Sequence, residues 1–175
     1  MKLKDKKIAF LVGPGFEDLE FWVPYMRLVE EGADVTTVGI HAGDVYSSKH
    51  GCLKAHADVG ADDVSPDDFD AVVIPGGWAP DKIRRYEGVK RLVKGVFDQG
   101  GIVGMICHAG LVGISAKIVA GRKATGSLGI KDDLENAGAV WVDAPAFRDG
   151  NLVWGRVVAD IPDFNRELIS ALAND

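Results

Sequence analysis

The residues best suited to covalent chemistry are Cys107 and His108, which lie in the stretch GIVGMICHAGLVG at residues 101–113. An apolar run at residues 102–106 ends at Cys107 and is followed by small residues and by apolar residues at helical spacing. This pattern predicts a strand, a sharp turn and a helix, as in the nucleophile elbow of hydrolases. A helix N-terminus favours a thiolate and lowers a cysteine pKa from about 8.5 into the range of about 3.5–7.5. We therefore predict that Cys107 is a nucleophile.

Two other predicted strand ends carry groups that a cysteine nucleophile needs. Glu17 follows the apolar run at residues 7–12, and the pair Gly76-Gly77 follows the run at residues 70–75. In an open α/β sheet, reactive groups gather beyond the carboxyl ends of the strands. If these strands are neighbours, a carboxyl group, backbone N–H donors and the sulfur meet in one pocket, which is a complete nucleophile site.

Each of these features also has a purely structural interpretation. Glu17 and the adjacent Asp18 complement the positive end of a helix dipole, and Gly76-Gly77 is compatible with a simple turn. A free cysteine such as Cys107 is most often a buried apolar residue. The functional interpretation depends on the three features occurring together.

The remaining elements follow from hydrophobic periodicity and from glycine and proline breaks. Strands are predicted at residues 7–12, 34–40, 70–75, 102–106, 122–125 and 140–142, with a hairpin or edge excursion at 41–58 and a hairpin at 147–152. Helices are predicted at residues 17–31, 89–99, 111–119, 131–137 and 161–172, a helix or loop at 78–86, and a helical turn or capped loop at 65–68. Alternating strands and helices predict right-handed crossovers and an α/β fold.

Composition limits the class of protein. The 175 residues are most simply one domain, residues 1–175, and the hydrophobic fraction of 47% with 26% charged residues is typical of a globular protein. The net charge of −6 argues against a nucleic-acid or anionic-membrane partner. The sequence shows neither a membrane-spanning run nor a signal peptide, so we expect a cytoplasmic protein.

The cysteine and histidine patterns give no reason to expect a metal or cofactor. Cys52 and Cys107 are far apart in the chain, and a reducing cytosol makes a disulfide between them unnecessary. The histidines show no zinc-binding spacing. His41, His50 and His56 fall in the irregular region and are expected on the surface or in loops, whereas Cys52 is expected to pack or to be weakly exposed.

Four motifs together resemble a known family. They are GFEDLE near the start, AxxIPGG, IVGMICHAG some thirty residues later, and GRKATGSLGIKDDLENAGAVWVD downstream. This combination, which covers essentially the whole chain, is similar to the PfpI branch of the DJ-1/PfpI superfamily, within the class I glutamine amidotransferase-like fold. The resemblance implies a doubly wound, mostly parallel, flavodoxin-like sheet sandwiched by helices, a nucleophile elbow, and a homo-oligomer, either a dimer or a hexamer.

The resemblance also implies roles for individual residues. Cys107 matches the nucleophile, Glu17 the carboxylic acid bonded to its sulfur, and His108 the histidine of PfpI-type proteases. Gly77 and the amide of His108 match the oxyanion hole. Asp81 in WAPDKIRR stands where the family has a glutamate that completes a triad from a neighbouring subunit. Gly76 and Trp78 are expected in the pocket wall.

The chain departs from the family pattern at several positions. Asp81 is one methylene shorter than the family's glutamate. Ala109-Gly110 replaces the usual Gly-Pro, and GRVVADIP replaces SRxPADL, which places Gly155 and Val158 at positions that often line the pocket. The fold and the nucleophile are expected to survive these changes.

The predicted function is that of a cofactor-independent cysteine enzyme. The resemblance implies action on small reactive carbonyls, as a glyoxalase or deglycase in stress protection, or on peptides, as an intracellular protease; we favour the small carbonyl. The alternative is an oxidative-stress sensor or protective protein that uses an oxidisable Cys107 without substantial turnover. A third hypothesis, an inert relic of the fold that serves as a structural partner, has the least support.

Overall fold

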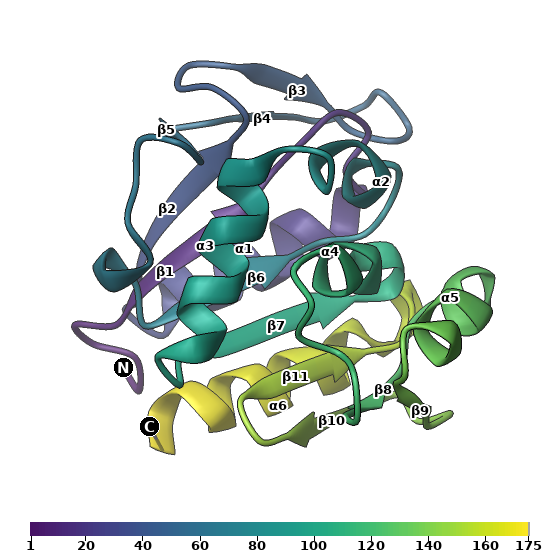
Figure 1. Cartoon of the computed structure of the whole chain (residues 1–175). Helices are drawn as coiled ribbons and strands as arrows, with labels where there is room; N and C mark the ends of the chain where they lie inside the picture. The colour runs from purple at the N-terminus through teal and green to yellow at the C-terminus, as the bar shows by residue number, and fades with distance from the viewer. Residues whose placement is uncertain (175) are drawn as a thin grey trace.

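The computed structural model describes residues 1–174, and its centre is a seven-stranded sheet. The strand order is β10-β11-β7-β6-β1-β2-β5 (Figure 1). All neighbouring strands run parallel except the edge strand β10, which pairs antiparallel with β11. The strands are β1 (Lys7–Leu11), β2 (Asp34–Gly39), β5 (Val59–Gly60), β6 (Ala71–Ile74), β7 (Ile102–Ile106), β10 (Ala146–Asp149) and β11 (Leu152–Gly155).

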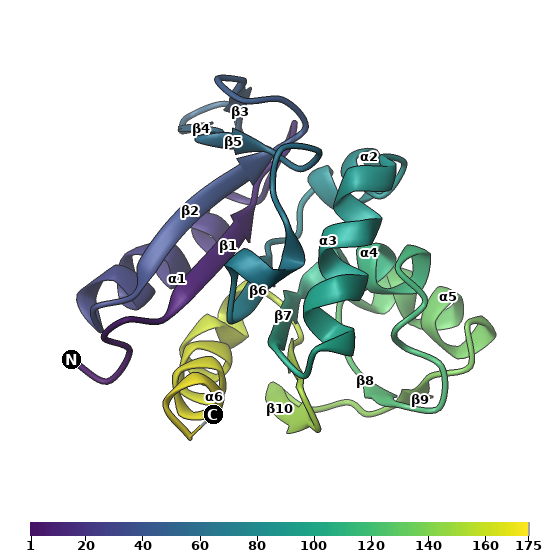
Figure 2. The same cartoon turned by 60° about the vertical axis from the view of Figure 1, so that its left-hand side comes forward.

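Helices cover both faces of this sheet. They are α1 (Asp18–Glu30), α2 (Ala79–Ile83), α3 (Glu87–Asp98), α4 (Gly110–Ser115), α5 (Lys131–Asn136) and α6 (Ile161–Asn174). Figure 2 shows α1 and α6 on one face and α2, α3, α4 and α5 on the other. The predicted α/β fold, a mostly parallel sheet between helices, is confirmed.

Alternation along the buried strands divides the core into two clusters, as expected because successive side chains of a strand point to opposite faces. Phe10 of β1 packs with Phe21 of α1 and Phe164 of α6. Its neighbour Ala9 belongs to the cluster on the other face, with Leu92 of α3. A sheet buried on both faces explains why β1, β6 and β7 appear in the sequence as nearly continuous apolar runs.

Smaller elements lie outside the seven-stranded sheet. The segment at residues 41–58 contains the antiparallel hairpin β3 (Val45–Ser47) and β4 (Lys54–His56), as predicted. The short strands β8 (Lys123–Ala124) and β9 (Val140–Trp141) pair with each other outside the main sheet. Residues 1–174 also contain four 3-10 turns: η1 (Pro66–Asp68), η2 (Cys107–Ala109), η3 (Leu128–Ile130) and η4 (Val158–Asp160).

One predicted helix is wrong in its extent. The apolar pattern predicts a helix over residues 111–119, whereas α4 ends at Ser115. Lys117 adopts a left-handed backbone with φ of 59°, and its N–H bonds to the carbonyl of Ile114, while the N–H of Ile118 bonds to that of Gly113. These contacts end the helix in the manner of a C-terminal cap.

Among the helices described, none combines the length and apolarity that a membrane-spanning segment requires.

Candidate active site

The turn after β7 has the geometry of a nucleophile elbow. Cys107 has a φ of 60°, a left-handed conformation that costs a residue with a side chain on the order of 1–3 kcal/mol. The backbone holds this conformation through the carbonyl of Cys107, which accepts the N–H of Ser127 at 3.1 Å. Gly126 allows the approach, because a Cβ there would lie 2.5 Å from the same carbonyl oxygen. The predicted strand, turn and helix are present, with η2, which contains Cys107, inserted between β7 and α4.

Neighbouring strands bring the glycine pair to the elbow. β6 lies between β1 and β7 in the sheet, so all three strands end at the same edge. A Cβ on Gly76 would lie 2.8 Å from the Cβ of Cys107 and 3.1 Å from the N of His108. Gly77 has a φ of 78°, and a Cβ there would lie 2.5 Å from the N of Glu17. Both positions therefore require glycine for the approach of the backbones to one another.

The carboxyl that interacts with the sulfur belongs to Glu20, and the predicted assignment of Glu17 is wrong. Oε2 of Glu17 caps helix α1 by accepting the N–H groups of Leu19 and Glu20, each at 2.9 Å. The side chain of Glu20 is 0% exposed, its Oε2 accepts the N–H of Gly76 at 2.8 Å, and its carboxyl interacts directly with the thiol of Cys107. Glu17 remains in the wall of the same cavity.

A sequence signal for Glu20 was present. Glu20, Pro24 and Leu28 recur every four residues and are all buried on α1, so they share one face of the helix. An acidic residue on an apolar helical stripe that faces the core needs a partner there. Here the N–H of Gly76 and the thiol of Cys107 supply it.

Burial raises the pKa of both acidic groups of the site, Glu20 and Cys107. Burial, with the nearby charge of Glu17, raises the pKa of Glu20 to about 7. Burial, followed by the charge and hydrogen bond of Glu20, raises the pKa of Cys107 to about 12. The amide of His108 and the charge of Lys49 act in the opposite direction and are outweighed. At neutral pH the pair therefore carries at most one negative charge, which sulfur and carboxyl share as a coupled system.

This result corrects the expectation that the helix N-terminus lowers the pKa of Cys107. Helix α4 spans only six residues and follows the 3-10 turn that contains the cysteine. The N-terminal effect of so short a helix is small compared with the removal of the sulfur from water. A thiolate here requires that the proton move to a neighbouring group.

His108 lies directly beside the sulfur. Its Nδ1 is 3.3 Å from Sγ of Cys107, and burial together with the charge of Lys49 lowers the pKa of the imidazole. Asp81, its predicted carboxylate partner, is exposed on α2 and accepts a hydrogen bond from Arg85 at 2.7 Å. Asp81 is also absent from the wall of the cavity around Cys107. Within one chain, the structure does not bring Asp81 and His108 together.

The sulfur opens into a cavity of about 320 Å³. The side chains and backbone that line it come from five separate segments of the chain: Glu17, Glu20, Lys49, His50, Gly77, Trp78, Cys107, His108, Val157, Val158 and Ala159. Trp78 forms an exposed rim, with the Nζ of Lys49 5.0 Å from its ring centroid. Val158 lines the cavity, whereas Gly155 lies in the core against Phe164.

Sequence reasoning missed Lys49 and His50, which reach the cavity from the β3–β4 hairpin loop. The N–H of Lys49 bonds to the carbonyl of Phe16 at 2.7 Å, which fixes the loop beside the segment that follows β1. Glu17, Asp18 and His50 place potential ligand atoms within 4.8 Å of one another. Oε2 of Glu17 and both carboxylate oxygens of Asp18 already accept hydrogen bonds, so the structure accounts for this cluster without a metal ion. Cys52, in the same loop, is exposed.

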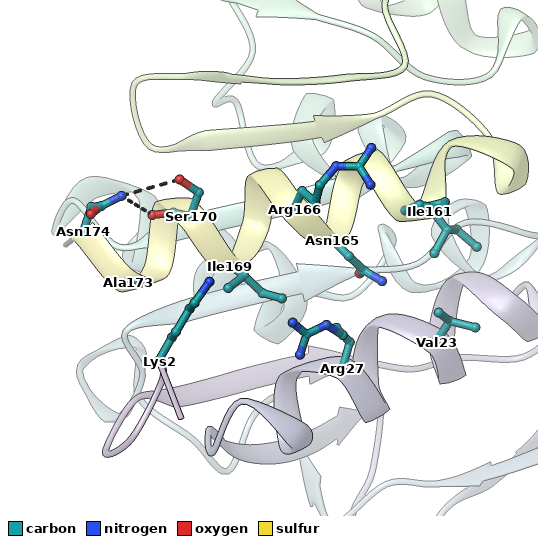
Figure 3. A pocket seen from close by; sticks show the side chains of 11 residues that line it. Lys2, Val23, Arg27, Ile161, Asn165, Arg166, Ile169, Ser170, Ala173 and Asn174 are labelled. Atoms are coloured by element: carbon teal, nitrogen blue, oxygen red, sulfur yellow. Dashed lines mark hydrogen bonds between the residues drawn. The ribbon is translucent and has the colours of Figure 1, made fainter.

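A larger cavity of about 650 Å³ lies elsewhere, between α1 and α6. Figure 3 shows Val23 and Arg27 of α1 opposite Ile161, Asn165 and Ile169 of α6. The lining of this groove includes neither a cysteine nor a histidine. The smaller cavity around Cys107 is therefore the candidate active site.

Comparison with known proteins identifies the family of the chain. The family model described as "DJ-1/PfpI family" matches residues 6–171. Deglycase PH1704 of Pyrococcus horikoshii is 42% identical over 166 residues, which cover 95% of this chain and 99% of that protein. General stress protein 18 of Bacillus subtilis is 38% identical over 168 residues, 95% of this chain and 98% of that protein.

A solved structure agrees with these sequence relatives. A two-domain protein of Anabaena variabilis with DJ-1/ThiJ/PfpI-like and ferritin-like domains superimposes with a TM-score of 0.94 at 38% identity, over 96% of this chain. The present chain spans about half of that protein, 48% of its length. The chain described here belongs to the DJ-1/PfpI family.

Proposed function

We propose that the protein is a cofactor-independent cysteine enzyme that acts on small reactive carbonyl compounds, with a glyoxalase or deglycase type of reaction. The observation that carries this proposal is the thiol of Cys107 between the carboxyl of Glu20 and the Nδ1 of His108, at the base of a cavity of about 320 Å³. The relatives named deglycases support the same class of substrate.

In the proposed reaction, the sulfur of Cys107 adds to an aldehyde carbon of the substrate. The thiol proton passes to Glu20 or His108, which both contact the sulfur. The backbone N–H groups of Gly77 and His108 are proposed to stabilise the oxyanion, since preorganised amides at this point stabilise developing charge. The raised pKa of Glu20, about 7, suits a group that must both accept and release a proton at neutral pH.

The site supports a small substrate better than a peptide. A peptide substrate requires a long open groove and a histidine that a carboxylate orients, whereas Asp81 pairs with Arg85 in this chain. Sensing of oxidants through Cys107 is the second candidate, because peroxide and a carbonyl substrate both react with the thiolate of this residue.

The expected assembly is a homo-oligomer in the cytoplasm, built from one domain that comprises residues 1–175. Leu19, Val23 and Met26 support self-association, because these apolar side chains lie exposed along one stripe of α1. Sedimentation velocity on the purified protein tests this expectation. A monomer at micromolar concentration would contradict it.

The function is tested with methylglyoxal in the absence of glutathione and of added metal. The wild-type protein is expected to form lactate, and Cys107→Ala to form none. Cys52→Ala provides the matched control, since Cys52 is the other cysteine and does not line the cavity. Full turnover by Cys107→Ala would exclude the proposed function. Selective oxidation of Cys107 without turnover of any carbonyl would favour the oxidant sensor.

A further inference from the structure

The cavity contains a second histidine, His50, which is held by a buried carboxylate. The Nδ1 of His50 lies 3.0 Å from Oδ2 of Asp18, and the backbone N–H of His50 donates to the same oxygen at 3.4 Å. His50 lies in the wall of the cavity that contains Cys107, but its ring is 61% exposed. The ring is therefore oriented by Asp18 while it remains in contact with solvent.

The surroundings of Asp18 stabilise its ionised carboxylate beside His50. The residue is 8% exposed, and its Oδ1 accepts the hydroxyl of Ser48 at 2.6 Å. Burial raises the pKa of Asp18, but the hydrogen bonds from Ser48 and His50 outweigh this effect and lower it. An ionised Asp18 accepts a hydrogen bond from Nδ1–H of His50, which keeps the ring proton on Nδ1 and leaves the lone pair of Nε2 free to accept a proton.

The loop that carries His50 is also fixed in place. The N–H of Gly51 bonds to the carbonyl of Ser48 at 3.0 Å, and the N–H of Leu53 bonds to Oγ of Ser48 at 3.2 Å. The N–H of Lys49 bonds to the carbonyl of Phe16, in the segment that leads to α1. Ser48 thus bonds both to the loop backbone and to Asp18, so the hairpin and helix α1 share one hydrogen-bond network.

The two histidines of the cavity are in different situations. The Nδ1 of His108 faces the sulfur at 3.3 Å, and in this chain its predicted partner Asp81 pairs with Arg85 instead. His50 has the aspartate that orients an imidazole, as in catalytic Asp-His pairs. His108 is thus placed to exchange a proton with the sulfur. His50 is placed to exchange a proton with a substrate in the cavity.

We infer that His50, held by Asp18, moves the proton between the two carbonyl carbons of a dicarbonyl substrate attached to Cys107. This inference rests on the proposed function. Addition of the thiol to the aldehyde carbon, C1, forms a C–S bond and a hemithioacetal. His50 removes the proton from C1, the C1 electron pair forms the C1=C2 bond of an enediol, and the C2 carbonyl oxygen takes up a proton. His50 returns its proton to C2, and the C1 hydroxyl loses its proton, which leaves a thioester.

Water then attacks the thioester, the C–S bond breaks, and the sulfur leaves as the thiol. For methylglyoxal, the net reaction of these steps is the addition of one water molecule to give lactate. It consumes neither an oxidant nor a reductant. His50 is the catalytic residue of this step. Asp18 is a positioning residue that acts through it.

The test measures methylglyoxal turnover and Cys107 alkylation on the same purified variants. His50→Gln is expected to lower kcat by about 100-fold, the ordinary scale of general acid-base catalysis, with the alkylation rate within twofold of wild type. Asp18→Asn is expected to lower kcat with little change in KM. His56→Gln, on β4 of the same hairpin and exposed, is the matched control and is expected to retain wild-type turnover.

Chemical rescue separates catalysis from a structural role. His50 is exposed enough for small molecules to reach its position, so added imidazole is expected to restore turnover to His50→Gly and not to Cys107→Ala. In D2O, the wild-type lactate is expected to carry deuterium at C2, because the ring exchanges its proton with solvent. Hydrogen retained at C2 would indicate a hydride shift and would overturn the inference.

The outcomes distinguish this inference from the proposed function. In one outcome, wild type forms lactate, Cys107→Ala forms none, and His50→Gln retains turnover within twofold. This outcome would support the proposed function and show that the inferred role of His50 is wrong. If His50→Gly loses turnover and imidazole restores none of it, the loss is structural and the inference fails. Lactate formation that is independent of Cys107 would remove the proposed function and this inference together.

Discussion

The carboxyl of Glu20 lies against the thiol of Cys107, and its Oε2 accepts the N–H of Gly76 at 2.8 Å. A side chain from α1 therefore connects the ends of β6 and β7 at the sulfur of Cys107. Because Glu20 is buried and Cys107 is half-buried, the pair does not hold two negative charges at neutral pH, and the position of the shared proton decides whether the sulfur is a thiolate.

Glu20→Gln is expected to stabilise the fold above pH 7. The raised pKa means that ionised Glu20 opposes folding: the cost is absent below about pH 4.5, grows as pH rises, and is complete above about pH 7. At about 1.4 kcal/mol per pKa unit, a rise from 4.5 to about 7 corresponds to roughly 3 kcal/mol. Thermal unfolding at pH 4.5 and pH 8 should show a higher Tm for the variant at pH 8 and little difference at pH 4.5.

Glu17→Gln is the matched control for that measurement. It weakens the N-cap of α1, so we expect a loss of about 1 kcal/mol at pH 4.5. At pH 8 the loss should be smaller, because the variant also removes a charge that raises the pKa of Glu20. Titration of Glu20 is expected to produce a step near pH 7 in the rate of Cys107 alkylation. The step should move to lower pH in Glu17→Gln, which removes a charge that raises the pKa of Glu20, and should disappear in Glu20→Gln. Persistence of the step in Glu20→Gln would show that another group produces it.

Gly76→Ala is expected to disrupt the site from the backbone. The new Cβ would lie 2.4 Å from Oε2 of Glu20 and 2.8 Å from the Cβ of Cys107, so one of the two must move. We expect a loss of about 1–3 kcal/mol in the free energy of unfolding and at least a tenfold fall in turnover. Gly100→Ala, which meets no atom within 4 Å but has a φ of 88°, should lose stability without loss of turnover.

Lys49→Gln is expected to slow the reaction of Cys107 with iodoacetamide. The ammonium group lowers the pKa values of Cys107, Glu20 and His108, so its removal raises all three. Because Lys49 is exposed, the expected change is about two- to threefold at pH 8 in low salt, and smaller at 0.5 M salt. Lys54→Gln, on β4 and outside the cavity, should show no change.

Asp81→Asn is expected to retain turnover within twofold. In this chain the carboxylate makes an exposed ion pair with Arg85, which is worth at most about 1 kcal/mol of stability. The measurement is methylglyoxal turnover beside a thermal unfolding curve. A tenfold loss of turnover at unchanged Tm would instead place Asp81 at His108 of a neighbouring subunit, as the PfpI resemblance implies.

Much of the fold could be predicted because its signals are local. The apolar runs at β1, β6 and β7 mark strands buried on both faces, and glycines with positive φ, such as Gly32 and Gly77, mark where elements end. The end of α4 could not be read in this way, because its apolar pattern continues past Ser115 while the backbone turns at Lys117.

The sequence by itself determined the position of the proposed nucleophile, because a single cysteine follows a buried strand and precedes a helix, and both elements are specified by their own residues. Only the tertiary structure decided which groups surround the sulfur. Glu17 and Glu20 are three residues apart, and the packing of α1 on the sheet through Phe21 and Leu28 directs Glu20 inward and leaves Glu17 as the cap. The same packing excludes water and so raises the pKa values of Glu20 and Cys107. The β3–β4 hairpin brings Lys49 and His50 to the cavity, although they are far from Cys107 in the sequence and no local pattern predicts this contact.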